Sequence, residues 1–239
     1  MTRTSFVLAA TLSLALGATA SADVIDQTAT INGMRVEYKV IRPRNFDPAK
    51  TYPAVLAFPP GDQSMLMVRV GIDYHYQAEA ERRGYLVIEP AAPDGVSFVR
   101  GGDKIFPAFI EKILADYRIE GGKFNASGQS NGGRAAFKIA ADYPQYFLSV
   151  TGLPGRLENA TPEKLDALAK LCLHNFVGED DDAWLGESRA QADALKARGA
   201  KMTLHVEKGQ GHVMDTVAYE GAARLFDQFD AARKGSCAE

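Results

Sequence analysis

The chain has little cysteine, no long hydrophobic run outside its first residues, no large excess of either charge and no short repeat. Two cysteines among 239 residues are too few for a disulfide-scaffolded miniprotein or a zinc ribbon. The 27 basic and 30 acidic residues nearly cancel, leaving a formal charge of −3, so we expect no nucleic-acid partner. The missing repeat excludes collagen-like, coiled-coil and low-complexity architectures.

What remains is the composition of an ordinary globular protein. Hydrophobic residues make up 46% of the chain and charged residues 24%, which is enough apolar material to drive a core and to exclude disorder as the main state. The length fits one large domain or two small ones. Because no linker rich in proline, glycine or serine divides the sequence, we predict a single domain over residues 23–239.

Residues 1–22 have the three-part pattern of a secretory signal peptide. Arg3 supplies the positive charge, residues 6–17 form an apolar run, and Ala20-Ser21-Ala22 offers small residues for cleavage. The run is shorter than the roughly 20 residues that span a bilayer. We therefore predict a mature chain that starts at Asp23, is secreted or periplasmic, and is not inserted in a membrane. The alternative is an uncleaved anchor.

Export to an oxidising compartment would allow Cys172 and Cys237 to pair. Cys237 lies near the C-terminus, where a flexible tail could bring it to many places. Cys172 lies between two leucines and could equally be a small buried hydrophobic residue. The sequence leaves both interpretations open.

Strands alternate with helices along the mature chain. Asn32-Gly33 is a strong two-residue turn signal and predicts an N-terminal β-hairpin. The expected strands are residues 28–31, 34–41, 54–58, 85–88, 123–127, 148–153, 171–177 and 201–206. The expected helices are residues 74–83, 105–117, 131–141, 183–198 and 217–233. This order predicts a doubly wound α/β domain whose sheet is mostly parallel, with helices on both faces.

One motif carries chemistry. Residues 128–132, Gly-Gln-Ser-Asn-Gly, match Gly-x-Ser-x-Gly between an expected strand and an expected helix. Such a turn holds Ser130 in strained backbone angles and exposes its hydroxyl at a helix N-terminus, where the N–H of Asn131 is free to bind an oxyanion. The alternative is a glycine-rich turn that merely begins a helix, with Ser130 as its cap.

A serine nucleophile needs a base, and the chain offers four histidines. His75 falls in an expected helix, and His174 and His205 fall in expected strands, where we expect them to be packed. His212 follows the last strand in a glycine-rich loop. Active sites of α/β proteins form in such loops, so His212 is our candidate base.

The base needs an orienting carboxylate, and four acids follow the strand at residues 171–177. Asp181 is our candidate, with Asp180 as runner-up. The alternatives are a solvated acidic turn in which Asp182 caps the next helix, or a calcium site, for which the wider ligand pattern is missing.

A second oxyanion donor should come from the loop after residues 54–58. Proline has no N–H, so neither Pro59 nor Pro60 can serve. The N–H of Asp62 is the candidate, with Gln63 as the alternative. No metal or organic cofactor is required by this chemistry.

The chain order Ser130, Asp181, His212 is that of α/β-hydrolases. The sequence also resembles the branch of that superfamily that contains polyhydroxybutyrate depolymerases and feruloyl or acetyl-xylan esterases. The matching stretches are Tyr117-Arg118-Ile119-Glu120, residues 127–133, Tyr143-Pro144 with Phe147, and residues 152–155. The Pro-Pro-Gly loop and the absence of an added substrate-binding module depart from the depolymerases and weaken a polymer-degrading interpretation.

We therefore expect a secreted serine esterase that acts on a small-molecule or oligomeric ester through an acyl-enzyme. A serine peptidase or a non-catalytic binding protein of the same fold stays open. Phe98, Phe106, Phe109 and Trp184 either line a substrate pocket or belong to the core.

Overall fold

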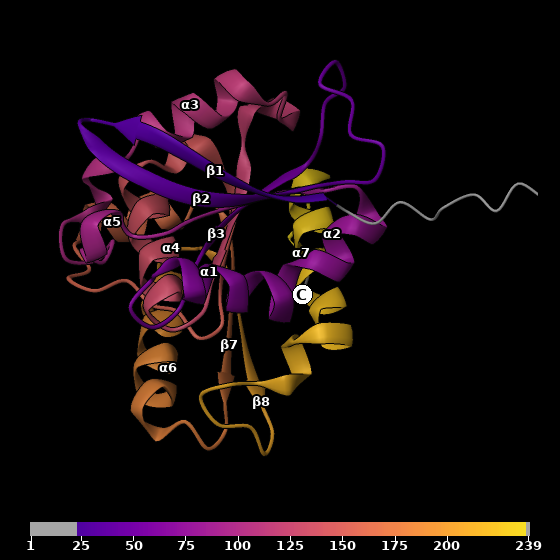
Figure 1. Cartoon of the computed structure of the whole chain (residues 1–239). Coiled ribbons are helices and arrows are strands. Elements are labelled where there is room, and N and C mark those ends of the chain that lie inside the picture. Colours follow the sequence, from indigo (N-terminus) through magenta and orange to yellow (C-terminus); the bar gives the residue numbers. More distant parts are fainter. Residues whose placement is uncertain (1–22, 238–239) are drawn as a thin grey trace, which may run out of the picture.

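The computed structural model describes residues 23–237, so the expected signal peptide lies outside the described residues. Eight strands form one sheet in the order β1-β2-β4-β3-β5-β6-β7-β8 (Figure 1). The strands are β1 (Asp23–Ile31), β2 (Met34–Arg42), β3 (Ala54–Phe58), β4 (Leu86–Pro90), β5 (Phe124–Gly128), β6 (Phe147–Gly152), β7 (Cys172–Gly178) and β8 (Lys201–Glu207). All eight expected strands are present, and β3 has the predicted bounds.

The strands from β3 to β8 run parallel to one another, while β2 is antiparallel to both β1 and β4. The turn between β1 and β2 is Asn32-Gly33, with φ angles of 51° and 80°. Both angles are positive, as a two-residue type I′ hairpin requires. The predicted hairpin and the mostly parallel sheet are therefore confirmed.

Helices cover both faces of the sheet, as a doubly wound fold requires. In Figure 1, α3 to α6 lie on one face, and α1, α2 and α7 lie on the other. The helices are α1 (Met65–Gly71), α2 (Gln77–Arg83), α3 (Ala108–Asp116), α4 (Asn131–Asp142), α5 (Pro162–Leu168), α6 (Asp182–Lys196) and α7 (Ala223–Arg233). No helix of the described part of the chain is both long and apolar enough to cross a membrane.

Two helical regions differ from the prediction. The expected helix at residues 74–83 begins earlier, because α1 continues through a π-helical segment, Ile72–Tyr76, into α2. The seven-residue helix α5 was not predicted, although Thr161 caps it by accepting a hydrogen bond from the N–H of Lys164 at 3.4 Å. A helix of two turns is too short to give a clear apolar periodicity.

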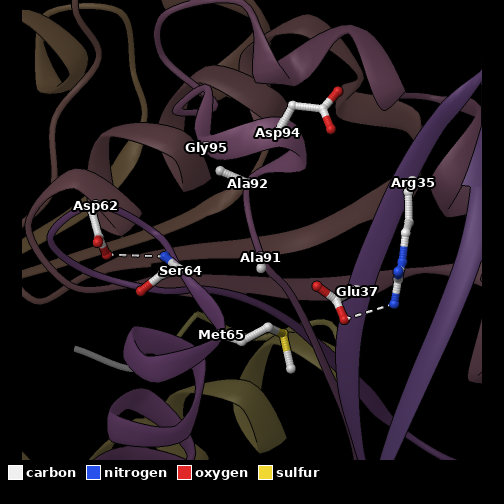
Figure 2. A pocket seen from close by; sticks show the side chains of 9 residues that line it. All are labelled: Arg35, Glu37, Asp62, Ser64, Met65, Ala91, Ala92, Asp94 and Gly95. Atoms are coloured by element: carbon white, nitrogen blue, oxygen red, sulfur yellow. Dashed lines mark hydrogen bonds and ion pairs between the residues drawn. The ribbon is translucent and has the colours of Figure 1, made fainter.

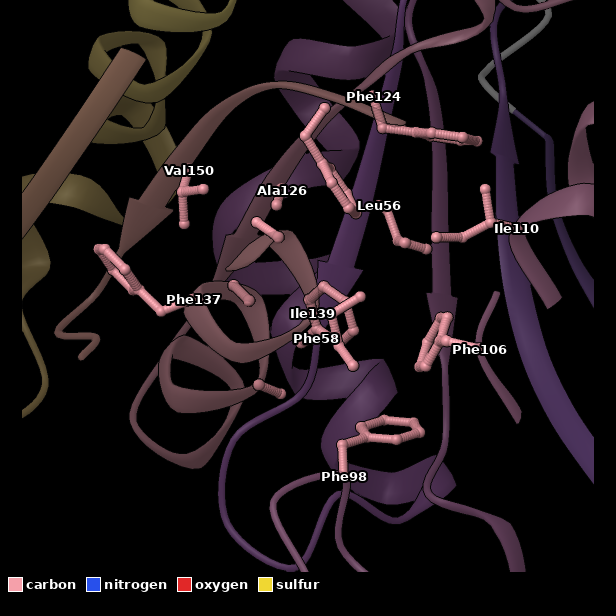
Figure 3. Close-up of a cluster of buried hydrophobic side chains, with 14 of the residues drawn as sticks. Leu56, Phe58, Phe98, Phe106, Ile110, Phe124, Ala126, Phe137, Ile139 and Val150 are labelled. Carbon is pink, nitrogen blue, oxygen red and sulfur yellow. The ribbon is translucent and has the colours of Figure 1, made fainter. Parts of the chain in front are cut away.

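Two buried layers hold the sheet to its helices. In the layer drawn in Figure 3, the rings of Phe98 and Phe106 meet at a centroid distance of 5.7 Å, with their planes inclined by 62°. Phe109 joins the same layer, and the three side chains are 0–4% exposed. Aromatic residues that are this buried and pack edge-to-face with one another belong to the core. The hypothesis that these three phenylalanines line a substrate pocket is therefore wrong.

The winding of the sheet reverses at β3. The strand β4 pairs with one side of β3, and β5 pairs with the other, with Phe58 level with Gly128 at their ends. In open parallel sheets, ligands bind in the crevice outside the carboxyl ends of the strands at such a reversal. The loops after β3 and β5 therefore begin side by side at the expected place of a functional site.

A disulfide joins Cys172 at the start of β7 to Cys237 beyond α7, with Cα atoms 5.3 Å apart. Cys172 is also 8% exposed. The residue is therefore both a buried member of the core and a bridge that ties the C-terminal tail to the sheet.

Candidate active site

Ser130 occupies a sharp turn between β5 and α4. Its backbone angles are φ 57° and ψ −116°, a combination that costs a residue with a side chain about 1–3 kcal/mol. Hydrogen bonds on both sides hold the turn: the N–H of Ser130 donates to the carbonyl of Pro154 at 2.9 Å, and the N–H of Arg134 donates to the carbonyl of Ser130 at 3.0 Å. The strained angles expected from the motif are present.

The glycines two residues before and after Ser130 allow strand and helix to touch. A Cβ atom on Gly132 would lie 2.0 Å from the carbonyl oxygen of Phe58, and one on Gly128 would lie 2.5 Å from the backbone of Gly132. Real Cβ atoms do not approach backbone atoms this closely. The spacing of the motif is therefore a packing requirement of the junction among β3, β5 and α4.

His212 lies between Ser130 and Asp181. Its Nε2 is 2.9 Å from the hydroxyl oxygen of Ser130, and its Nδ1 is 2.7 Å from a carboxylate oxygen of Asp181. The three residues come from the loops after β5, β7 and β8. A serine hydroxyl, an imidazole and a carboxylate joined in this order can transfer the hydroxyl proton to the ring during nucleophilic attack.

Asp181 is the one acid of the four-residue acidic run whose contact with His212 the structure records. Its side chain is 7% exposed, whereas Glu179 and Asp180 are exposed. Asp182 is the first residue of α6 and follows the N-cap position, which Asp181 occupies without a capping hydrogen bond. The geometry therefore does not support Asp182 as the cap of α6, and it does not support Asp180 as the carboxylate that orients His212.

Backbone contacts bring the loops of the acid and the base together. The N–H of Asp180 donates to the carbonyl of Gln210 at 2.9 Å, and the N–H of Glu179 donates to that of Glu207 at the same distance. A Cβ atom on Gly178 would lie 2.2 Å from the carbonyl of Gln210. Glycine at the end of β7 therefore permits the close approach that the contact between Asp181 and His212 needs.

The other three histidines are packed or half-buried. The Nδ1 of His75 lies 2.9 Å from the carbonyl of Val217, and burial lowers the pKa of its imidazole. His174 is 1% exposed, and its ring stacks 5.9 Å from that of His205. The pKa of His174 is lowered to about 4, mainly by burial and to a smaller extent by the charge of the nearby His205. These rings belong to the core and the sheet, as expected.

The two candidate oxyanion donors lie on adjoining loops. Asn131 is the first residue of α4, so its N–H has no acceptor within the helix. Its side-chain amide donates to the carbonyl of Gly61 at 2.8 Å and ties the two loops together. The N–H of Gln63 is already engaged with the carbonyl of Pro60 at 3.0 Å, whereas no backbone carbonyl within residues 23–237 accepts a hydrogen bond from that of Asp62. The geometry therefore favours Asp62 over Gln63.

Gln63 has a structural role that the sequence did not reveal. Its side chain is fully buried, accepts a hydrogen bond from the N–H of Phe98 at 2.9 Å, and donates to the carbonyl of Pro59 at 3.3 Å. The glutamine thus holds the loop after β3 against the segment near Phe98. A polar residue in a loop gives no sequence signal of such burial.

Two adjoining hollows of about 410 and 440 Å³ open beside these loops, and they share Asp62 and Gly95. Figure 2 shows the first hollow, where the carboxylate of Asp62 accepts a hydrogen bond from the N–H of Ser64 and Arg35 pairs with Glu37. Hydrogen bonds from Ser64 lower the pKa of Asp62. The second hollow is lined by both Asp62 and Asn131, so a bound molecule there would meet both candidate donors.

Comparison with solved structures identifies the architecture. A ferulic acid esterase has a TM-score of 0.69 at 15% identity, and the match covers 90% of this chain and 99% of that chain. A thermostable esterase has a TM-score of 0.65 at 17% identity over 87% of this chain. The fold is the α/β-hydrolase fold. An S-formylglutathione hydrolase from Agrobacterium tumefaciens shares this α/β-hydrolase architecture, with a TM-score of 0.64 at 14% identity, over 92% of this chain and 98% of that one.

These likenesses concern architecture, because the identities lie far below the level at which activity is shared. This chain spans about 60% of the length of the thermostable esterase. No family model and no curated protein matches the sequence. The resemblance to esterases of the α/β-hydrolase fold is confirmed at the level of fold.

Proposed function

We propose that this protein is a secreted carboxylic ester hydrolase that works through an acyl-enzyme. The observation that supports it most strongly is the hydrogen-bonded series from Ser130 through His212 to Asp181, at 2.9 and 2.7 Å. In this mechanism the hydroxyl of Ser130 attacks the ester carbonyl while Nε2 of His212 takes its proton. Asp181 holds the imidazole in the required tautomer and stabilises the imidazolium that forms.

The negative charge that develops on the carbonyl oxygen needs donors in place before the reaction. The N–H groups of Asn131 and Asp62 are our candidates, because neither donates a hydrogen bond to a backbone carbonyl within the described residues. Removing one such donor typically raises the barrier by about 3 kcal/mol. The protonated His212 then gives its proton to the departing alkoxide, which leaves an acyl group on Ser130. In the second half of the reaction, His212 takes a proton from water while the water attacks the acyl carbonyl, and it returns that proton to the oxygen of Ser130 as the acid is released.

The first test is Ser130→Ala, assayed with p-nitrophenyl acetate and with a fluorophosphonate probe. We expect the variant to lose hydrolysis and labelling while its melting temperature stays near that of the parent, because alanine removes only a half-buried hydroxyl and its hydrogen bond to the partly exposed ring of His212. Ser236→Ala, an exposed serine near the C-terminus, serves as the control and should keep full activity. Turnover or labelling retained in Ser130→Ala would contradict the proposal.

A matched ester and amide of the same acyl group separate the esterase from a peptidase. We expect the ester to be cleaved with a much higher kcat/KM, since an alkoxide is a better leaving group than an amine. Faster cleavage of the amide would favour the peptidase, and reaction with neither substrate nor probe would favour a binding protein.

The secretion part of the proposal rests on residues 1–22. Expression of the full chain in a Gram-negative host, followed by mass spectrometry of the periplasmic fraction, should give a mature N-terminus at Asp23. A full-length product retained in the membrane fraction would support the uncleaved anchor instead.

A further inference from the structure

Trp184, the chain's one tryptophan, packs against the candidate base. It lies in the first turn of α6, three residues after Asp181, and is 8% exposed. The centroid of its ring is 5.5 Å from that of His212, with the two planes inclined by 37°. The fourth aromatic candidate from the sequence is thus a wall of the site, not a residue of the distant core.

Two arginines hold the indole in place. The guanidinium carbon of Arg134 lies 4.5 Å from the indole centroid, and that of Arg156 lies 5.4 Å from it. Each arginine is itself anchored: Arg134 pairs with Glu158 at 3.2 Å, and Arg156 pairs with Glu187 at 2.6 Å. A guanidinium over an aromatic face is attracted by the negative potential of the ring. The indole is therefore restrained from several directions.

The same cluster reaches the oxyanion side of the site. Nη1 of Arg134 donates to the side-chain oxygen of Asn131 at 3.0 Å, while the side-chain amide of Asn131 holds the carbonyl of Gly61. Arg134 thus contacts both the indole beside His212 and the residue that carries a candidate oxyanion donor. Arg134 therefore helps to hold both His212, through the indole, and the backbone of Asn131.

The imidazole needs such a support. Hydrogen bonds at Nδ1 and Nε2 fix the two ring nitrogens, but they leave the ring able to tilt about the line that joins them. The side chain of His212 is 41% exposed, so solvent offers little resistance to that tilt. An aromatic face packed beside the ring removes this freedom, and a displacement of about 1 Å at a catalytic group can cost on the order of 100-fold in rate.

We propose that Trp184 is a positioning residue for His212, held in place by Arg134 and Arg156. This inference rests on the proposed function of the site. It concerns the orientation of the base and adds no group to the chemical steps. It predicts that removing the aromatic face lowers kcat more than it raises KM.

The kinetic test compares two substitutions at the same position. We expect Trp184→Leu to lower kcat about 10- to 100-fold with KM within about threefold. Trp184→Phe keeps an aromatic face and should recover most of the loss. Arg156→Gln should lower kcat by a few fold, and Arg189→Gln, an exposed arginine on the same helix, is the matched control with parental kinetics. Parental kcat in Trp184→Leu would overturn the proposal.

The second test does not depend on turnover. Because the chain holds a single tryptophan, its emission reports on Trp184 alone, and an imidazole ring packed beside an indole alters that emission. At one fixed pH, the emission of His212→Gln should differ in intensity and wavelength from that of the parent, because the ring 5.5 Å from the indole is removed. The emission of His205→Gln should match that of the parent. Parental emission in His212→Gln would overturn the proposal.

The two proposals fail in different ways. A protein without hydrolytic activity or probe labelling that still shows the His212-dependent emission change would refute the proposed function and leave the packing intact. An active esterase with parental kcat in Trp184→Leu would refute the positioning role alone. Since Trp184 is buried, unfolding of each variant is measured first, and kinetics are taken well below its melting temperature.

Discussion

Asp181 accepts a hydrogen bond from His212 at 2.7 Å, whereas Asp180, the preceding residue, is exposed. Both carboxylates stand in the same acidic loop after β7, and they differ in where the turn directs them. The loop is held by the N–H of Asp180 donating to the carbonyl of Gln210. A backbone contact at one residue therefore sets the direction of the next side chain.

The pair Asp181→Asn and Asp180→Asn separates the two carboxylates. Asparagine at residue 181 can stabilise the wrong tautomer of His212, so we expect kcat to fall by about 10⁴-fold. The Asp180 variant keeps the backbone contact and should stay within about twofold of the parent in the same p-nitrophenyl ester assay. Equal losses in both variants would contradict the assignment of Asp181.

Gly132→Ala tests the packing of the serine turn. Its new methyl group would lie 2.0 Å from the carbonyl oxygen of Phe58. The atoms nearest to that methyl group are backbone atoms of Phe58 and Pro59, which cannot move aside as a flexible side chain could. We therefore expect the free energy of unfolding to fall by about 3 kcal/mol or more, which is in the upper range for single substitutions. Urea unfolding measures it.

Gly186→Ala is the matched control for that substitution. Gly186 is exposed within α6, and a Cβ atom there meets nothing within 4 Å. Alanine should raise stability by about 0.5–1 kcal/mol through helix propensity. A Gly132 variant as stable as this control would show that the turn tolerates a side chain.

The sequence predicted the order of elements because strands buried on both faces are short apolar runs. The strand at residues 54–58 is a continuous apolar run ended by Pro59-Pro60-Gly61, and its observed bounds match. The expected helix at residues 217–233 begins only at Ala223, because two short 3₁₀ segments precede it. Apolar spacing does not distinguish such turns from the start of a helix.

The site was predictable only in part, because a side chain's direction depends on its turn. Ser130 and His212 follow from a motif and from the one histidine in a glycine-rich loop. The choice between Asp180 and Asp181 depends on how the loop rotates, which local sequence does not fix. The burial of Gln63 and the contact of Trp184 with His212 join segments far apart in the chain, and no periodicity reports such contacts.

Stability should depend on pH through His174. Both of its ring nitrogens are buried without a hydrogen-bond partner within the described chain, and burial lowers its pKa to about 4. The unfolded chain protonates near the ordinary pKa of about 6.5. The unfolded state therefore binds more protons between these values, so stability present above pH 6.5 is lost as pH falls toward 4.

His174→Phe removes that titration while keeping an aromatic ring in the strand. We expect the parent to lose up to about 3 kcal/mol more than the variant in the free energy of unfolding between pH 7 and pH 4. Urea unfolding at a series of pH values measures the difference. Parallel pH profiles for the two proteins would show that His174 does not contribute.

The disulfide between Cys172 and Cys237 should stabilise the fold by restricting the unfolded chain. The two cysteines are separated by 65 residues. Closing a loop of that length contributes about 4 kcal/mol in the chain-entropy description. Cys237→Ser removes the bond and leaves the buried Cys172 in β7, so we expect a loss of that order and a melting temperature lower by about 10 °C.

Reductant provides the control for this variant. Dithiothreitol should lower the stability of the parent to that of Cys237→Ser and leave the variant unchanged, as measured by urea unfolding with and without reductant. The loop of the candidate site that carries Asp181 lies at the opposite end of β7 from Cys172, because Asp181 follows Gly178. Ester hydrolysis by the reduced protein should therefore persist at temperatures where it stays folded. If dithiothreitol left the free energy of unfolding of the parent unchanged, the disulfide would not stabilise the fold.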